Sequence, residues 1–305
     1  MDLDLINQRV ALVADLFQNS HSEEELRKLL ETNCRGGDYG PDMQLRSRLA
    51  VTDEVLDGEK WYRICAKHPA GSGKTKRILY LHGGNWVLET GPHQRLFASF
   101  LAEQTGAEVW FPEYPLAPEY HCTDSYEMLI KLYEKLLSEA AADEIALAGD
   151  SAGGSIALGL AMYLKEKKLP QPNNLILLSP VPYIPLVFAP EDQAFLDMMS
   201  ANGVPTLNFK NQKIIESWWQ GPLEENNYLV NPVFGDLRDL APMTIFVGSG
   251  ESLITQRLCV NAAKQRVKIR YWEKRNAPHV WVTRDDLENA EERAYIVELL
   301  RNPDK

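Results

Sequence analysis

Residues 145 to 154 read Ile145-Ala-Leu-Ala-Gly-Asp-Ser-Ala-Gly-Gly154 and are the most informative segment for the fold. Its first four residues are an apolar run typical of a buried strand, and the apolar stretch from Ile156 to Leu164 is typical of a helix. Ser151 therefore stands between Gly149 and Gly153 where a strand turns into a helix. Glycines are needed there because so sharp a turn strains the backbone and brings neighbouring residues together. The pattern predicts an exposed serine hydroxyl at the sheet edge, and the alternative is an ordinary structural turn.

Further apolar runs extend this strand into a sheet. They are short, continuous and separated mostly by helical stretches, as expected for parallel strands buried on both faces. Two antiparallel strands joined by a turn at Asp57-Gly58 are expected before them. We therefore predict an α/β fold with an open, mostly parallel sheet of roughly eight strands, flanked by helices. The expected strands are 51–55, 61–65, 78–81, 108–111, 145–148, 175–178, 244–247 and 268–272, with a closing helix from 286 to about 301.

An insertion is predicted between two core strands. About 60 residues, from Pro180 to Leu240, stand where a crossover helix would need about a quarter as many. The N-terminal residues also show helical periodicity, with Ser22 and Glu25 in a capping-box pattern before the second helical stretch. We expect one domain whose helical cap covers the active edge of the sheet. Its expected parts are the domain 1–305, cap elements at about 1–45 and 181–240, and cap helices at 191–201 and 209–220.

A second motif, His82-Gly83-Gly84-Asn85-Trp86, also follows an apolar strand. Adjacent glycines let backbone N–H groups point into a cavity, which stabilisation of a tetrahedral oxyanion requires. We predict that the N–H groups of Gly83 and Gly84 act as oxyanion donors. The N–H of Ala152 is a third candidate, because it lies at the N-terminus of the helix after the serine. The alternative for the glycine pair is an ordinary strand-to-loop turn.

The serine needs a general base, and His279 is the one histidine that follows Ser151 in the sequence. A carboxylate must orient the imidazole, and Glu251 lies in the loop after the predicted strand 244–247. We therefore predict a triad in the order Ser151, Glu251, His279. For Glu251 the alternatives are a solvated acid or a cap for the following helix. Activity should fall as the pH drops through the titration of His279, near ~6.5 for an unperturbed ring.

For several other side chains near these motifs, the sequence allows two alternative roles. Trp86, Trp218 and Trp219 are candidates for lining a substrate pocket under the cap, together with Phe195. Aromatic residues at such positions as often form the core of a cap. Asp150, beside the serine, either accepts a hydrogen bond at the elbow or is solvated.

Taken in this order, the motifs resemble those of the hormone-sensitive-lipase-like branch of the α/β-hydrolases, a group of microbial carboxylesterases. The resemblance covers residues 78 to 281 and implies an α/β-hydrolase fold with Ser151 as nucleophile. The sequence departs from the family pattern at Asn85, Pro115 and Glu251, where glycine or alanine, arginine and aspartate are usual. The matching segments are H-G-G at 82–84, Y-x-L-A-P-E at 114–119, G-D-S-A-G-G at 149–154, the acid loop at 251–253 and the histidine loop at 279–281.

The resemblance implies a serine carboxylesterase that acts through an acyl-enzyme on a small-molecule ester, with a preference for short chains. An amide hydrolase of the arylformamidase type is an alternative, because such enzymes share the H-G-G and S-A-G-G elements. A non-catalytic small-molecule receptor on the same fold is another. The sequence leaves open the acyl-chain length, the alcohol, the stereopreference and the oligomeric state, with a homodimer among the alternatives.

Composition excludes several other classes of protein. The chain has 305 residues, of which 45% are hydrophobic and 25% charged, as in folded proteins. Its net charge of -11 disfavours nucleic acids and anionic lipids as partners. The first residues carry acid where a secretory signal carries base, and no apolar run approaches the ~20 residues that span a bilayer. We therefore expect a cytoplasmic protein without stable membrane insertion, and the motifs imply no cofactor. We also expect no metal site, since the four cysteines and six histidines show no ligand spacing.

Overall fold

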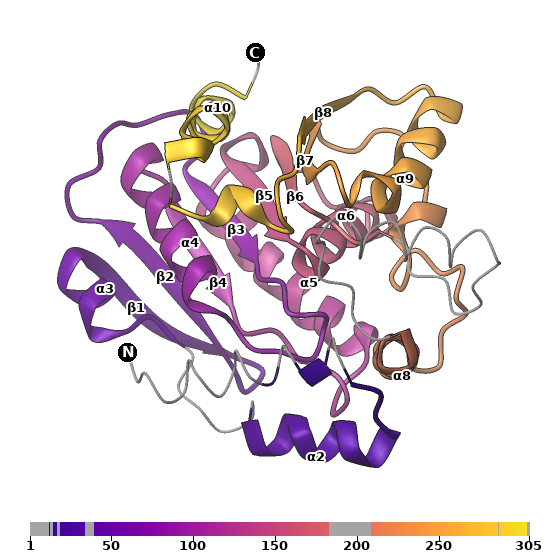
Figure 1. The fold of residues 1–305 in the computed structure, drawn as a ribbon. Coiled ribbons are helices and arrows are strands. Elements are labelled where there is room, and N and C mark those ends of the chain that lie inside the picture. Colours follow the sequence, from indigo (N-terminus) through magenta and orange to yellow (C-terminus); the bar gives the residue numbers. More distant parts are fainter. Residues whose placement is uncertain are drawn as a thin grey trace.

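The computed structural model describes residues 12, 15–16, 19–33, 40–182, 209–285 and 287–303. In this part of the chain one eight-stranded sheet runs through the molecule in the order β1-β2-β4-β3-β5-β6-β7-β8 (Figure 1). The β1–β2 and β2–β4 pairs are antiparallel, and all other pairs are parallel. The strands are β1 (Leu49–Leu56), β2 (Glu59–Ala66), β3 (Arg77–Leu81), β4 (Glu108–Pro112), β5 (Ile145–Asp150), β6 (Asn174–Leu178), β7 (Met243–Gly248) and β8 (Ile269–Lys274).

Helices cover both faces of the sheet. Leu79 and Leu81 of β3 point into a core with α5, α6 and α9, whereas Ile78 and Tyr80 of the same strand point into a second core with α3, α4 and α10. Burial on both faces explains why the central strands β3 to β7 are mostly apolar runs. The α-helices are α2 (Glu23–Asn33), α3 (Met43–Arg48), α4 (Pro92–Thr105), α5 (Cys122–Glu139), α6 (Ala152–Glu166), α8 (Phe209–Gln220), α9 (Ser252–Lys264) and α10 (Ala290–Arg301).

The fold class predicted from the sequence is confirmed, and each predicted strand lies within two residues of an observed one. Asp57 and Gly58 have positive φ values and form the turn between β1 and β2, as predicted. The closing helix was placed too early. Residues 287–289 form a 3-10 turn, and α10 begins at Ala290, because the Asn289 side chain donates a hydrogen bond to the carbonyl of Trp281.

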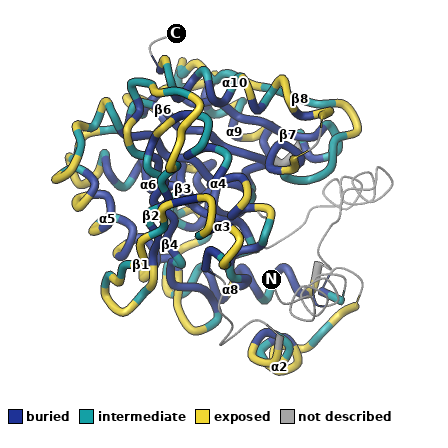
Figure 2. Tube along the Cα trace, turned by 90° about the vertical axis from the view of Figure 1, so that its left-hand side faces the viewer, coloured by how far each residue is buried: buried dark blue, intermediate teal, exposed yellow. Residues whose placement is uncertain are grey.

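Two helices predicted for the cap are present and pack on each other. Ser22 and Glu25 form the expected capping box at the start of α2, and α8 has the predicted bounds. The Trp218 indole of α8 donates to Glu23 of α2 at 2.9 Å, and the Arg27 guanidinium lies over its ring. The outer side of α2 is exposed, whereas the central strands β3 to β7 are almost entirely buried (Figure 2). The predicted helix at 191–201 and most of the first N-terminal helix lie outside the described residues.

Within the described segments no helix has the length and apolar character needed to cross a bilayer.

Candidate active site

Ser151 occupies a strained turn between β5 and α6. Its φ is 53° and its ψ is -123°, a conformation that residues with a side chain rarely adopt. A Cβ on Gly149 would collide with the carbonyl oxygen of Gly153, and a Cβ on Gly153 would collide with that of Leu81. Only glycine fits at both positions, as predicted from the sequence. The turn places the serine at the carboxyl edge of the sheet.

Three predicted residues meet at this edge. The Ser151 Oγ lies 2.9 Å from His279 Nε2, and His279 Nδ1 contacts the Glu251 Oε2. The residues come from the turn after β5, the loop after β7 and the loop after β8. Because Nδ1 faces a carboxylate it carries the proton, which leaves Nε2 to accept from the serine hydroxyl. The arrangement can move a proton from Ser151 to the ring.

Glu251 is 2% exposed, and both of its carboxylate oxygens have hydrogen-bond partners. Its Oε1 accepts from the Ser179 hydroxyl and, at 2.9 Å, from the Gly248 N–H. It stands at the N-cap of α9 without a side-chain capping bond, so the solvated acid and the helix cap are both wrong. Burial would raise the pKa of Glu251, but the charge and hydrogen bond of His279, with the other two donors, lower it below its ordinary value.

The contact with Glu251 also shifts the pKa of His279, and it raises this pKa. Burial would lower the pKa of His279, but the Glu251 charge and hydrogen bond, together with the Asp150 charge, raise it above its ordinary 6.5. The unperturbed value used in the sequence analysis is therefore too low.

Ser179 is a site residue that the sequence analysis missed. It follows β6 directly, with a φ of 46°, and its N–H donates to the Phe246 carbonyl. Its hydroxyl donates to Glu251 and accepts from the Val280 N–H at 3.0 Å, so it joins the acid loop to the histidine loop. The available signal was a serine at the carboxyl end of a buried strand, just before a proline.

The glycine loop after β3 packs directly against the serine turn. A Cβ on Gly83 would lie 2.8 Å from the Ser151 Cβ, and Gly84 has a φ of 135°, where a Cβ would collide with the Leu88 carbonyl. In the described part of the chain, the N–H groups of Gly83, Gly84 and Ala152 donate to no acceptor. All three remain available to an oxygen near Ser151.

Asp150 is buried rather than solvated, with a 1% exposed side chain. Its carboxylate accepts from the Tyr80 hydroxyl and from the Gln94 amide, each at 2.8 Å. Sequence reasoning missed both partners, because a tyrosine within an apolar strand and a glutamine within a helix carry no distinctive signal.

The three predicted pocket tryptophans are buried where the cap meets the core. Trp86 stacks on Trp219 at 5.7 Å between ring centroids, and Trp218 contacts α2 as described above. These contacts favour the cap-core interpretation, whereas Phe195 lies outside the described residues. Close to Trp86, the Asn85 amide bonds to Gln212 of α8 at 3.1 Å. Helix α8 therefore contacts the glycine loop.

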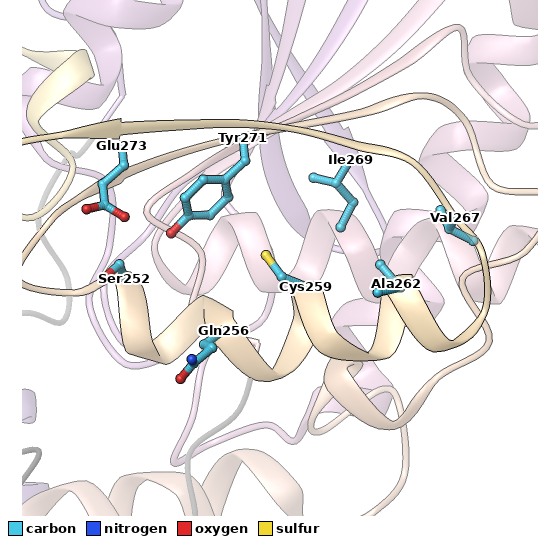
Figure 3. A pocket seen from close by; sticks show the side chains of 9 residues that line it. Ser252, Gln256, Cys259, Ala262, Val267, Ile269, Tyr271 and Glu273 are labelled. Carbon is cyan, nitrogen blue, oxygen red and sulfur yellow. The ribbon is translucent and has the colours of Figure 1, made fainter.

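Other features of the described residues do not suggest a second catalytic centre. Nowhere among them do three or more His, Cys, Asp or Glu side chains converge as metal ligands. A cavity of about 500 Å³ lies between α9 and the edge strand β8 (Figure 3). None of the three triad residues lines it. Its lining residues are Ser252, Gln256, Cys259, Ala262, Ala263, Val267, Ile269, Tyr271 and Glu273.

Comparisons with known proteins agree with the fold. A protein-family model described as alpha/beta hydrolase fold matches residues 78–283. An esterase of Acinetobacter venetianus is 30% identical over 251 residues, 81% of this chain and 77% of the esterase. A triacylglycerol lipase of Mycobacterium tuberculosis is 29% identical over 219 residues, 71% of this chain but 43% of the lipase. The solved structure of an esterase from the bacterial hormone-sensitive lipase family has a TM-score of 0.75 at 23% identity, and the match covers 99% of this chain and 98% of that one.

Proposed function

Because this chain belongs to the hormone-sensitive-lipase-like family of α/β-hydrolases, we propose that it is a serine hydrolase that cleaves carboxylic esters. The observation that carries the proposal is the unbroken contact chain from Ser151 through His279 to Glu251, beside three N–H donors that meet no acceptor among the described residues. The names of the relatives, an esterase and a triacylglycerol lipase, support an ester as the substrate. A preference for short acyl chains is what the resemblance to microbial carboxylesterases implies.

In the proposed mechanism His279 Nε2 takes the proton of Ser151 as the oxygen attacks the ester carbonyl. The N–H groups of Gly83, Gly84 and Ala152 donate to the oxyanion of the tetrahedral intermediate. Glu251 holds the ring and stabilises the imidazolium. The imidazolium then protonates the leaving alcohol, which leaves an acyl group on Ser151. Water, deprotonated by the same ring, attacks the acyl-enzyme, and collapse of the second intermediate releases the acid and restores the serine.

The test is a panel of p-nitrophenyl esters from acetate to palmitate, assayed with the wild type and with Ser151→Ala. Loss of the nucleophile should lower kcat by about three orders of magnitude or more. A fluorophosphonate probe should label the wild type and not the variant. Ser99→Ala is a suitable control, because this buried hydroxyl bonds the Arg95 carbonyl of its own helix.

Two outcomes would overturn the proposal. Folded wild-type protein that neither hydrolyses esters nor accepts the probe would favour the non-catalytic receptor. Faster turnover of N-formylkynurenine than of every ester in the panel would favour the amide hydrolase.

A further inference from the structure

Two carbonyl groups of the glycine loop, those of His82 and Gly83, are each held by a buried side chain. The Tyr114 hydroxyl donates to the His82 carbonyl at 2.6 Å, and the Gln94 Nε2 donates to the Gly83 carbonyl at 3.2 Å. The His82 Nδ1 lies 2.8 Å from the same Gly83 oxygen. In a trans peptide the carbonyl and the following N–H point in opposite directions. Holding these two carbonyls therefore aims the N–H groups of Gly83 and Gly84 away from Tyr114 and Gln94.

The orientation of the Gln94 amide follows from the chemistry of its partners. Its Oε1 accepts from the Gly91 N–H at 2.6 Å, and an N–H can bond only to an acceptor. Its NH₂ group has two hydrogens and meets two acceptors, the Gly83 carbonyl and the Asp150 carboxylate. Gln94 is 3% exposed, so water does not compete for these bonds. The amide is therefore held in one position.

The Asp150 contact extends this restraint to the nucleophile. Asp150 immediately precedes Ser151, and its other carboxylate oxygen accepts from the buried Tyr80 hydroxyl. One amide nitrogen thus touches both halves of the site, the loop that offers the N–H donors and the turn that carries the serine. The two halves lie in direct contact, because a Cβ on Gly83 would meet both Asp150 and Ser151.

We propose that Gln94 is a positioning residue that locks the glycine loop to the serine turn and aims the Gly84 N–H at the oxyanion. This inference rests on the proposed function. Removing an oxyanion donor outright costs an enzyme about 10²- to 10³-fold in kcat. A donor that is present but misdirected should cost less, about 30- to 100-fold.

The test is Gln94→Met, which keeps the length of the side chain and removes its amide. The measured quantities are kcat and KM for p-nitrophenyl butyrate, divided by the fraction of protein that a fluorophosphonate labels at completion. We expect kcat per labelled site to fall about 30- to 100-fold with KM within about twofold. The affinity for a trifluoromethyl ketone, which forms a tetrahedral oxyanion on serine, should fall by a similar factor. Gln104→Met, on the same helix, is the matched control.

Tyr114→Phe provides an independent variant if Gln94→Met does not fold. It removes one hydroxyl from a buried ring, releases the His82 carbonyl, and should lower kcat per labelled site about tenfold. Values within threefold of the wild type for the folded variant or variants, with unchanged ketone affinity, would overturn the inference and leave the proposed function standing. A wild type that is neither labelled nor active would instead remove the proposed function itself.

Discussion

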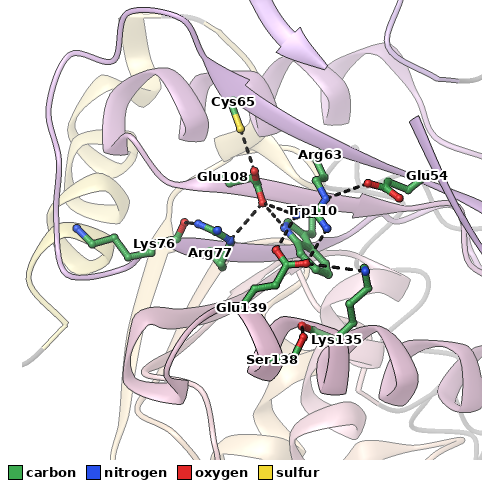
Figure 4. A network of polar contacts seen from close by, with 10 residues as sticks. All are labelled: Glu54, Arg63, Cys65, Lys76, Arg77, Glu108, Trp110, Lys135, Ser138 and Glu139. Atoms are coloured by element: carbon green, nitrogen blue, oxygen red, sulfur yellow. Dashed lines mark hydrogen bonds and ion pairs between the residues drawn. The ribbon is translucent and has the colours of Figure 1, made fainter. Parts of the chain in front are cut away.

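Two polar networks lie at opposite edges of the sheet, and their contrast shows what distinguishes the proposed active site from a network of ion pairs. At the carboxyl edge Glu251, His279 and Ser151 form the contact chain described above. At the amino edge the Arg63 guanidinium contacts the carboxylates of Glu54, Glu108 and Glu139 and lies 4.5 Å over the Trp110 ring (Figure 4). Carboxylates with several partners are present in both networks, so charge pairing does not identify the active site.

The two networks differ in backbone conformation and in the group that pairs with the carboxylates. Ser151, Ser179 and Val280 all have positive φ values, whereas Arg63 and Glu108 lie in regular strands. Hydrogen bonding to Glu139, despite partial burial, raises the pKa of Arg63 further, so the amino-edge cation never loses its proton. At the carboxyl edge the carboxylate of Glu251 instead contacts the imidazole of His279, which can gain or lose a proton. Strain combined with an exchangeable proton therefore indicates the reactive edge.

The largest expected effect comes from Glu251→Gln. An amide neither stabilises the imidazolium nor enforces the Nδ1–H tautomer, so kcat should fall about 10³- to 10⁴-fold with the fold intact. Ester turnover and circular dichroism measure the two quantities. Glu139→Gln at the amino edge is the control and should keep kcat within about twofold. A loss of kcat below tenfold for Glu251→Gln would contradict a catalytic role for the carboxyl-edge network.

Arg63→Met should have the next largest effect, on stability alone. It leaves three carboxylates without their shared cation, and the free energy of unfolding should fall by about 2 kcal/mol, less than for a fully buried pair because Arg63 is 18% exposed. Urea unfolding measures this change. Arg238→Met removes an exposed pair with Asp236 and should change stability much less. Reduced turnover of folded Arg63→Met protein would contradict the division between the two edges.

Ser179→Ala should have a smaller effect, a lower kcat, because it removes a hydroxyl that supports Glu251 at the carboxyl edge. Glu251 loses one donor and the Val280 N–H loses its acceptor, which should lower kcat about tenfold. The ratio of kcat to KM should fall with it, while the global fold is retained. Ser252→Ala removes a neighbouring hydroxyl that bonds only the Ser249 carbonyl and should leave kcat unchanged. Equal rates for the two variants would show that Ser179 does not hold the acid.

The smallest expected effect is a shift in the pH profile. The base must be neutral, so kcat/KM falls as the pH drops below the pKa of His279. Because Glu251 raises this pKa, half-maximal kcat/KM should lie above pH 6.5. In Glu251→Gln the raising charge is gone, and the midpoint should move to lower pH. A flat profile from pH 5 to 8 in the wild type would exclude His279 as the base.

Most of the sheet was predictable because its signals are local. Continuous apolar runs identify the parallel strands, since helices cover both faces, and Asp57-Gly58 marks the hairpin turn. The triad was predictable for a related reason. Each of its members follows a predicted strand, and the carboxyl ends of parallel strands lie at one edge of a sheet.

The supporting residues were not predictable in the same way. Gln94 looks like any polar residue of a helix, and Tyr80 like any aromatic residue of a strand. Their partner Asp150 is far from both in the sequence. The tryptophans of the cap likewise suit a pocket or a core equally well until α8 is placed on the glycine loop.

Apolar periodicity and glycine requirements act over a few residues, so the amino-acid sequence was enough to predict the order of strands and helices, the serine turn and the candidates for acid and base. The folded chain was needed to show that Ser179 holds Glu251, that Gln94 contacts both halves of the site and that the Arg63 network lies at the opposite edge. The physical reason is that buried polar groups must find hydrogen-bond partners, and folding brings those partners from distant segments of the chain.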